Sequence, residues 1–389
     1  MKRSITILPT ILFIVAGFIG CNQSKPKSDG FITVDVTATY PKKELILQDF
    51  MDVEYIPLET KDDFICQGRV EAVGKDVLIV RNRTDDGDIF IFARNGKALR
   101  KINRKGQGGE EYTYYSTFVL DENKNELFVN DAFSKKILVY DLEGNFKRKL
   151  PHKDNFLFFE MYNFDRDNLI CHDSYNDNCT GDLHVGQSFI IISKQDGSIT
   201  KEIQIPFEKK ETIKVVNKDE ASGLNYVYLP STVHPIVPYF ENYVLVELSA
   251  DTVYGYSPDH TMKPLIVRTP SIGSMKPEEF LLLSIITDRY YFMEAVEKTI
   301  EFSFTNIVYD KQENALYRYK VYNDDYNNDE EAFLKSRPLN GEIPSCQYLE
   351  AWKLVQDYKG GRLKGRLKEI AAKLDPEDNP VIMLIKHKK

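Results

Sequence analysis

The sequence predicts an all-β fold, a six-bladed β-propeller with a C-terminal amphipathic helix packed on the ring. Residues 69–103 and 116–150 are look-alike stretches, each with three runs of aliphatic and aromatic residues separated by polar turns. A glycine stands at the tip of the last hairpin in each copy, and a third, longer copy covers 169–205. A β-unit that repeats at a period of about 50 residues is typical of propellers, whose blades are small antiparallel sheets.

The three copies also agree in register. An aliphatic residue stands six positions after each turn glycine: Ile102, Leu150 and Ile203. An isoleucine stands seven positions before each of these glycines: Ile89, Ile137 and Ile190. Because three units match at two positions, the pattern indicates true repeats.

The later blades are more diverged. The segment 243–267 contains three short apolar runs that form a plausible fourth blade. Strands of the fifth blade are expected at 290–292, 300–309 and 315–322. Between the two, Pro277-Glu278-Glu279 resembles the first turn of a helix, so a helical segment is expected at about 276–284.

Both ends of the chain are expected to meet in the sixth blade. The run 381–385 would supply one strand, and the N-terminal strands at 32–36 and 53–58 would complete this last blade and fasten the ring. Before the final strand, apolar residues at helical spacing predict the amphipathic helix: Leu363, Leu367, Ile370, Ala371 and Leu374. Its basic side chains also allow a membrane-surface helix as the alternative.

The N-terminus predicts a lipoprotein. Residues 1–20 have a basic start and a short apolar run, typical of a signal peptide, and Cys21 follows a small residue as in a bacterial lipobox. An ordinary signal peptide with an incidental cysteine is the alternative. Residues 21–30 form a polar tether, and 31–389 form the propeller. We therefore expect a cell-envelope protein held by acyl chains, in the outer membrane and facing the periplasm.

Charge and cysteine content limit the partners. The formal net charge is −8, which argues against nucleic acid, because phosphates need clustered Lys and Arg. Cys171 and Cys179 are close enough in sequence for a loop disulfide in an oxidising compartment. No cysteine pair has C-x-x-C spacing, and His172 and His184 lie too far apart within an irregular stretch to predict a metal site.

Several of these segments together resemble a known family. Cys21 after its leader, the run 53–60 (VEYIPLET), the glycine-rich 106–112 (GQGGEEY) and the ending 378–384 are similar to those of the six-bladed β-propeller lipoproteins of Bacteroides-type bacteria. That family resembles the NHL-repeat propellers. The resemblance implies the propeller fold and an extracytoplasmic location. It implies no reaction.

Candidate ligand contacts come from loops. The segment 106–112 lacks the phosphate-loop pattern, so its glycines are expected in an inter-blade turn, where Gln107, Glu111 and Tyr112 could contact a ligand. Arg289 could face the channel and contact a sugar or carboxylate, although strand core is equally plausible. The acidic run 324–331 does not fit an EF-hand, which leaves a solvated loop or adventitious calcium.

The function predicted from these observations is binding. The chain contains neither G-x-S-x-G nor H-E-x-x-H, so we expect a non-catalytic propeller that binds a glycan or an envelope protein at one end of the ring. The alternative is a propeller enzyme of the lactonase, lyase or glycosidase type, with its site at the channel mouth. Converging carboxylates or histidines at that mouth would favour the enzyme.

Overall fold

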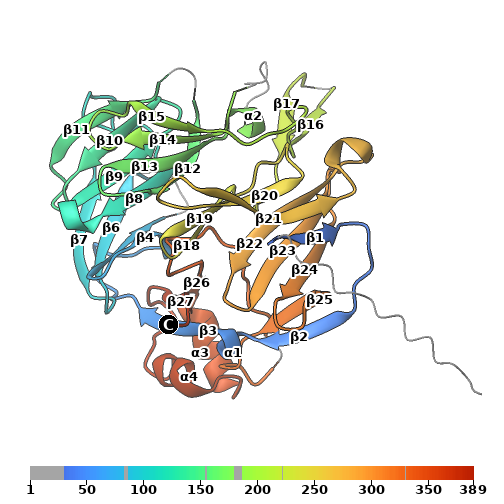
Figure 1. The fold of residues 1–389 in the computed structure, drawn as a ribbon. Coiled ribbons are helices and arrows are strands. Elements are labelled where there is room, and N and C mark those ends of the chain that lie inside the picture. Colours follow the sequence, from blue (N-terminus) through green and yellow to red (C-terminus); the bar gives the residue numbers. More distant parts are fainter. Residues whose placement is uncertain (1–29, 83–85, 154–155, 179–185, 221, 329) are drawn as a thin grey trace, which may run out of the picture.

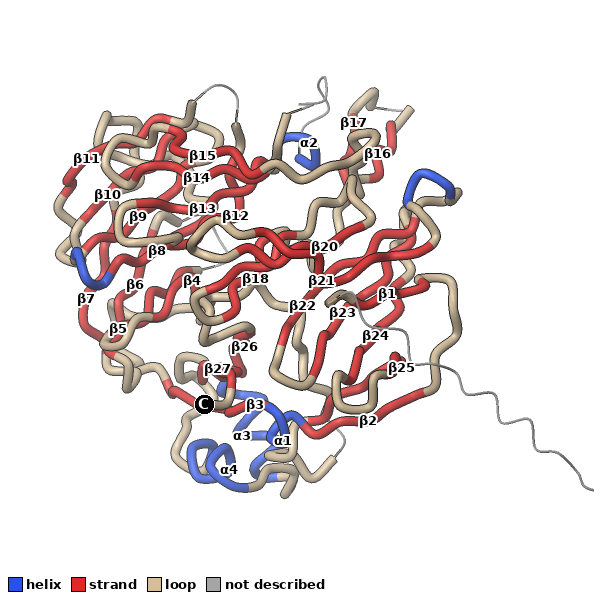
Figure 2. Tube along the Cα trace, in the orientation of Figure 1, coloured by secondary structure: helices blue, strands red, loops and turns tan. Residues whose placement is uncertain are grey.

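Six β-sheets are arranged around a central axis in the computed structural model (Figure 1). The structure describes residues 30–389 except 83–85, 154–155, 179–185, 221 and 329. Strands dominate the described chain, and the few helices lie outside the blades (Figure 2). The predicted all-β, six-bladed fold class is therefore confirmed.

The first three blades are four-stranded antiparallel sheets that follow the predicted repeats. In each of them the strands run in sequence order from the axis outward. The third blade has its longest connection between β13 and β14. Blade 1 holds β4 (Arg69–Val73), β5 (Val77–Arg81), β6 (Asp88–Ala93) and β7 (Ala98–Asn103). Blade 2 holds β8 (Thr117–Asp121), β9 (Glu126–Asp131), β10 (Lys136–Tyr140) and β11 (Phe146–Pro151). Blade 3 holds β12 (Phe158–Asn163), β13 (Asn168–Asp173), β14 (Phe189–Ser193) and β15 (Ile199–Ile203).

Blades 4 and 5 each carry a fifth strand from the N-terminus. Blade 4 holds β18 (Ile236–Tyr239), β19 (Asn242–Leu245), β20 (Thr252–Tyr256) and β21 (Met262–Thr269), with β1 (Ile32–Asp35) parallel to β21. Blade 5 holds β22 (Glu279–Ile286), β23 (Tyr290–Glu297), β24 (Phe304–Asp310) and β25 (Ala315–Tyr322), with β2 (Lys42–Ile46) parallel to β25. A small hairpin of β16 (Val215–Lys218) and β17 (Asn225–Tyr228) lies between blades 3 and 4.

Blade 6 joins the two ends of the chain. It contains β26 (Ser345–Leu349), β27 (Val381–His387) and the N-terminal strand β3 (Met51–Pro57), which pairs with β27 over seven residues. Of the N-terminal strands, only β3 lies in this last blade, whereas β1 and β2 extend the outer edges of blades 4 and 5. Parallel pairing on those edges leaves fewer exposed backbone groups there.

One predicted element is wrong. The segment 276–284 is not helical, because Glu279–Ile286 forms the innermost strand β22 of blade 5. Its last seven residues are all buried and, except for Ser284, apolar, and such a short apolar run fits a buried strand as well as a helix. Only a single 3-10 turn, η2 (Ile272–Ser274), precedes it.

The C-terminal helices pack beside blade 6. Helix α4 (Gly365–Ala371) lies within the predicted amphipathic segment, and its Leu367, Ile370 and Ala371 join a core formed by blades 5 and 6. A second helix, α3 (Ala351–Lys359), contributes Leu354 to the same core and had no counterpart among the expected elements. The short helices are α1 (Leu47–Phe50), α2 (Tyr175–Asn178) and the 3-10 turn η1 (Glu122–Lys124). Among the described helices, none has the length and apolar content needed to cross a membrane.

The seam between blades 6 and 1 rests on a close backbone contact. Gly96 has φ of +87°, and a Cβ atom there would lie 2.0 Å from the carbonyl oxygen of Pro57 in β3. The amide of Glu59 donates a 2.8 Å hydrogen bond to the Gly96 carbonyl, and the Glu59 carboxylate accepts one from Ala98. Only glycine fits this left-handed turn against the closing strand.

We expect Gly96→Ala to lower the free energy of unfolding by about 2–4 kcal/mol, because it adds left-handed strain and a backbone clash. Urea unfolding of the purified protein measures this change. Gly109→Ala is the matched control, because a Cβ at Gly109 meets no atom within 4 Å and should change the stability by less than about 0.5 kcal/mol. Equal effects of the two substitutions would contradict this account of the seam.

Candidate functional site

The antiparallel blades define two ends of the ring. At one end, here the hairpin end, the first and second strands of each blade are joined by tight turns, such as β4–β5 and β12–β13. At the other, the crossover end, the chain passes from the last strand of one blade to the first strand of the next. Successive antiparallel strands reverse direction, so the loops of one blade alternate between these two ends.

A segment without regular strands crosses the centre of the ring. Residues 332–344, here called the strap, connect blade 5 to β26 and occupy the place of an innermost strand in blade 6. The Cys346 amide donates a 2.8 Å hydrogen bond to Ser336 Oγ. Strap side chains also reach other blades, since Asn340 donates to the Val73 carbonyl of β4 and Arg337 Nη2 donates to the Met161 carbonyl of β12. The strap therefore fills the axis of the propeller.

Three buried glutamates surround the strap. Glu71 of blade 1, Glu160 of blade 3 and Glu294 of blade 5 are exposed by 4, 6 and 0 %. The strap supplies the opposite charges: Lys335 pairs with Glu294, and Arg337 lies 3.7 Å from Glu71 Oε2 and 4.0 Å from Glu160 Oε1. Buried carboxylates need such partners, because an unpaired charge in the interior is strongly destabilising.

Glu71 has a second cation within its own blade. Arg81 Nε of β5 lies 2.7 Å from Glu71 Oε1, and both residues are buried.

Glu160 also has a second partner. His234 Nδ1 lies 3.0 Å from Glu160 Oε1, and the Tyr162 hydroxyl donates to Glu160 Oε2 at 3.0 Å. Burial alone would raise the pKa of Glu160, but the hydrogen bond from His234 and the charge of Arg337 lower that pKa below its usual value. The central carboxylates are thus satisfied from within the chain, which assigns them to the assembly of the ring.

The strap and the buried glutamates that it pairs with are together called the plug, and a large cavity lies on its hairpin-end side. It has a volume of about 1330 Å³, with walls from blades 1, 2, 3, 4 and 6 and with strap residues 339–343 at its base. Among the described residues, eight Lys or Arg and six Asp or Glu line it. This lining is net positive in a protein of net charge −8, so the cavity differs in charge from the molecule as a whole.

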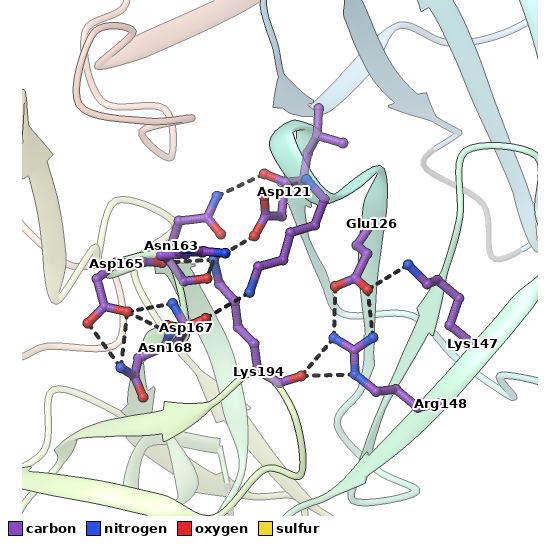
Figure 3. Close-up of polar contacts among 12 residues, drawn as sticks. Asp121, Glu126, Lys147, Arg148, Asn163, Asp165, Asp167, Asn168 and Lys194 are labelled. Carbon is purple, nitrogen blue, oxygen red and sulfur yellow. Dashed lines mark hydrogen bonds and ion pairs between the residues drawn. The ribbon is translucent and has the colours of Figure 1, made fainter.

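A buried ion pair fixes the cavity wall between blades 2 and 3 (Figure 3). Lys194 Nζ lies 2.8 Å from Asp121 Oδ2 and donates to the Asp165 carbonyl at 2.9 Å, and its residue is only 3 % exposed. The backbone carbonyl of Lys194 in turn accepts hydrogen bonds from Arg148. Three blade elements, the ends of β8 and β14 and the β12–β13 turn, are therefore held together at the cavity wall.

The pair beside this wall is structural. Arg148 makes two 2.7 Å hydrogen bonds to the Glu126 carboxylate (Figure 3). These bonds from Arg148, with a further contribution from Lys147, lower the pKa of Glu126 to about 2, although burial acts in the opposite direction. Glu126 is therefore ionised across the physiological range and serves to orient Arg148.

An aromatic residue stands at the cavity rim in a strained conformation. Phe240, in the β18–β19 turn, has φ of +49° and is 39 % exposed. Its amide donates a 2.7 Å hydrogen bond to the Gly341 carbonyl of the strap, and a Cβ at Gly341 would lie 2.0 Å from the Phe240 carbonyl oxygen. The ring contacts Tyr239 and His387, with centroids 4.9 and 5.3 Å away. Strain of this kind in an exposed bulky residue is typical of binding sites.

The glycine-rich loop 106–112 does not form the predicted ligand platform. Tyr112 is completely buried, and its hydroxyl donates to the Gly87 carbonyl at 2.6 Å. The Glu111 carboxylate accepts from the Gly108 amide, so it closes the loop on itself. Gln107 is exposed, but the loop connects β7 to β8 at the crossover end and is remote from the cavity. Its tyrosine and glutamate therefore have structural roles.

Arg289 is likewise engaged in the fold. It pairs with the buried Asp310 at 2.7 Å and contacts Glu313, in the β22–β23 turn at the hairpin end. The four predicted ligand residues, Gln107, Glu111, Tyr112 and Arg289, thus lie at opposite ends of the ring and form no common site.

Of the predicted disulfide, the structure describes only Cys171, which is a fully buried thiol in β13. Burial raises its pKa, which leaves the thiol protonated. Its predicted partner Cys179 and the predicted lipidation site Cys21 lie outside the described residues.

The acidic run 324–331 and the basic C-terminal helices lie against each other. Lys364 pairs with Asp324 at 2.8 Å, and its amide donates to the Asp325 carbonyl. Lys353 and Arg362 both pair with the buried Asp357. The acidic run and the C-terminal helical segment are therefore joined by an ion pair and a backbone hydrogen bond. No group of three His, Cys, Asp or Glu that could hold a metal ion occurs among the residues that the structure describes.

The residues that build the cavity and the plug were not recognised in the sequence. Lys335, Arg337 and Phe240 stand in irregular segments, where neither strand periodicity nor a known motif marks them. Their partners are distant along the chain, since 266 positions separate Arg337 from Glu71. The one available signal was the pair of basic residues Lys335 and Arg337, which stand between two predicted strands in the segment that follows the acidic loop.

Comparison with known proteins identifies the family. A family model described as DUF5128, 6-bladed beta-propeller, matches residues 22–336. The chain belongs to this family. The match confirms the predicted resemblance to six-bladed propellers. No match was found among curated proteins.

One solved structure similar to this DUF5128 chain shares its fold, and two others match it at lower TM-scores. The one that shares the fold is described as an exported protein from Bacteroides fragilis NCTC 9343. It superposes with a TM-score of 0.57 at 16% identity, and the match covers 90% of this chain and 99% of that chain. A duf4221 family member from Bacteroides vulgatus has a TM-score of 0.43 at 10% identity, covering 87% and 98%. Virginiamycin B lyase from Staphylococcus aureus has a TM-score of 0.33 at 10% identity, and the match covers 66% of this chain and 88% of the lyase chain.

We expect Arg337→Met to lower the free energy of unfolding by about 2–4 kcal/mol, because Arg81 and His234 replace its charge beside the buried Glu71 and Glu160 only in part. Urea unfolding at pH 7 checks this value against Arg166→Gln, which removes an exposed arginine of the cavity. Lowering the pH should partly restore the Arg337→Met variant, because loss of the Arg337 charge raises the pKa of the buried Glu160 carboxyl, which then takes up a proton more readily in the folded state. An equal loss in both variants would contradict the role of the plug.

The pH dependence of stability should report on His387. Burial lowers the pKa of His387 to about 4, with Asp288 and Glu342 opposing the shift in part. The unfolded chain therefore binds more protons than the folded one between about pH 6.5 and 4, so stability is lost as the pH falls through this window. His387→Phe keeps a ring against Tyr239 and Phe240, and it should remove about 2 kcal/mol of that loss. Parallel profiles of stability against pH for the wild type and His387→Phe would contradict this role of His387.

Proposed function

We propose that this chain is a lipid-anchored, extracytoplasmic propeller that binds a polar ligand in the hairpin-end cavity. The observation that carries the proposal is the cavity of about 1330 Å³, which has a mixed but net positive lining and a closed base. A rigid concave site with a few placed polar groups is the usual form of a binding pocket.

The hydrogen bonds of the acidic residues in the cavity support a binding role over a catalytic one. Asp121 holds Lys194, Asp165 holds Asn168, and the Glu122 carboxylate accepts hydrogen bonds from the amides of Lys75 and Asp76. A general acid or base needs a carboxyl or imidazole that is free to exchange a proton with a substrate. These carboxylates are instead occupied in shaping the turns of the wall.

The position of the N-terminus supports the anchor. Residue 30 precedes β1, which lies on the outer edge of blade 4, so the chain leaves the ring from its rim. A tether from Cys21 to this point spans at most about 30–35 Å. With such a tether the ring stays near a membrane while its cavity remains accessible. We place this membrane in the cell envelope, as an outer membrane with the protein facing the periplasm.

Lipidation is tested by labelling cells with an alkyne fatty acid. The wild-type chain should incorporate the label and partition into the detergent phase, because the acylated cysteine becomes its first residue. Cys21→Ala should lose both properties, whereas Cys66→Ala, the control, should keep them. Label that persists in Cys21→Ala would refute the anchor.

Ligand binding is tested by a thermal-shift screen of the purified protein against glycans, peptides and divalent cations. A ligand of the cavity should raise the melting temperature by several degrees at saturating concentration. Asn123→Trp, which fills the cavity from its wall, should abolish that shift. Lys97→Trp, outside the cavity on the same end of the ring, should preserve it. A hit that both variants retain would place the ligand elsewhere on the protein.

A further inference from the structure

We propose that the ligand of the cavity is an oligosaccharide that carries acid groups. This inference rests on the proposed function above and names its ligand class. It draws on three features of the site: the volume of the cavity, a fixed aromatic ring at its rim, and two cations on its wall that have no partner among the described residues.

The size of the cavity favours a chain of several units. Its volume of about 1330 Å³ exceeds the range of about 300–1,000 Å³ that is usual for single small-molecule ligands. The strap closes the base at residues 339–343, so a ligand enters and leaves through the hairpin end. A flexible oligomer lying across the mouth fits this shape better than one compact molecule.

Phe240 offers a flat apolar surface at a fixed position. Its ring is braced by Tyr239 and His387, and its backbone is locked to the strap through Gly341. The negative face of an aromatic ring attracts polarised hydrogen atoms, as on the C–H face of a sugar. A braced ring also loses little side-chain entropy when a ligand packs on it. The strain at Phe240 is therefore consistent with a stacking platform.

Two cations on the cavity wall are available to a ligand. Within the described part of the chain, the side chains of Lys75 and Arg166 have no hydrogen-bond or ion-pair partner, and both residues are exposed. Their backbones are nevertheless fixed. The Lys75 amide donates to Glu122, and the Arg166 carbonyl lies in the turn held by Lys194. Fixed, unpaired cations in a net positive cavity favour an anionic ligand, and Arg166 can take a carboxylate in bidentate geometry.

The same site is poorly suited to an extended peptide. Peptides in grooves of β-proteins usually add a strand to a free sheet edge. Here the innermost strands β4 and β12 already give carbonyl groups to the strap, at Val73 and Met161. The exposed amide of Asn123 and the guanidinium of Arg166 instead suit hydroxyl and carboxylate oxygens.

Isothermal titration of the full-length protein in mild detergent tests the proposal. The probes are hexasaccharides of galacturonic acid, of mannuronic acid and of a sulfated sugar, with maltohexaose as the neutral sugar and hexaglutamate as the acidic peptide. We expect at least one acidic hexasaccharide to bind at least tenfold more tightly than both maltohexaose and hexaglutamate. Its affinity should fall with added salt, because charge contributes to binding.

Matched variants divide the binding between its parts. Lys75→Gln combined with Arg166→Gln should weaken the acidic sugar at least tenfold and remove its advantage over maltohexaose. Phe240→Ala should weaken it at least fivefold and leave the salt dependence unchanged. Lys97→Gln combined with Lys149→Gln removes the same charge outside the cavity and should leave the affinity within twofold. Circular dichroism verifies that each variant is folded.

Each contrary result overturns a defined part. Equal or tighter binding of hexaglutamate refutes the sugar, and equal binding of maltohexaose refutes the acid group. Binding that Asn123→Trp does not reduce refutes the cavity as the place. If no hexasaccharide binds, the ligand class is wrong. The proposed function then still stands if the thermal-shift screen yields another ligand that Asn123→Trp abolishes, and it fails if the screen yields none.

Discussion

The neutralisation of three buried glutamates by the strap is the interaction on which the rest of the structure depends. Glu71, Glu160 and Glu294 come from alternate blades, and Lys335 and Arg337 bring positive charge to all three at the axis. Arg81 and His234 neutralise Glu71 and Glu160 further. Because one short segment carries both cations, it ties blades 1, 3 and 5 to blade 6 and closes the channel. The same segment forms the base of the cavity and holds Phe240 through Gly341. Assembly of the ring and formation of the candidate site therefore share one element.

The fold was largely predictable because its information is local. A blade is built from neighbouring strands, so its turns and apolar runs repeat in the sequence. The aligned positions pair directly in blades 1 and 2, Ile89 with Ile102 and Ile137 with Leu150. In blade 3, Ile203 pairs with Phe189, one position before the aligned Ile190. Prediction failed where local patterns are ambiguous. The run that forms β22 is apolar at every buried position except Ser284 and lacks the alternation that separates strand from helix. The N-terminal strands β1 and β2 pair with blades 4 and 5, and no local feature specifies that choice.

The candidate site could not be predicted because its residues are brought together only by the closed ring. Phe240, Lys75 and Arg166 come from the turns of three different blades, and none belongs to a motif. Conversely, Tyr112 and Glu111 drew attention because they adjoin a glycine-rich segment. In the structure that segment is a compact inter-blade turn that buries the tyrosine and uses the carboxylate for its own amides. Local composition identified a loop correctly and its role incorrectly.

The order in which the N-terminal strands join the blades has a mechanical consequence. Tension applied at residue 30 acts first on β1, which pairs with β21 at four positions on the rim of blade 4. It reaches β2 on blade 5 only after β1 has detached, and the seven-position ladder between β3 and β27 last. The two outer strands therefore detach before the β3–β27 pairing bears the load, and the closure of the ring is protected from tension at the N-terminus.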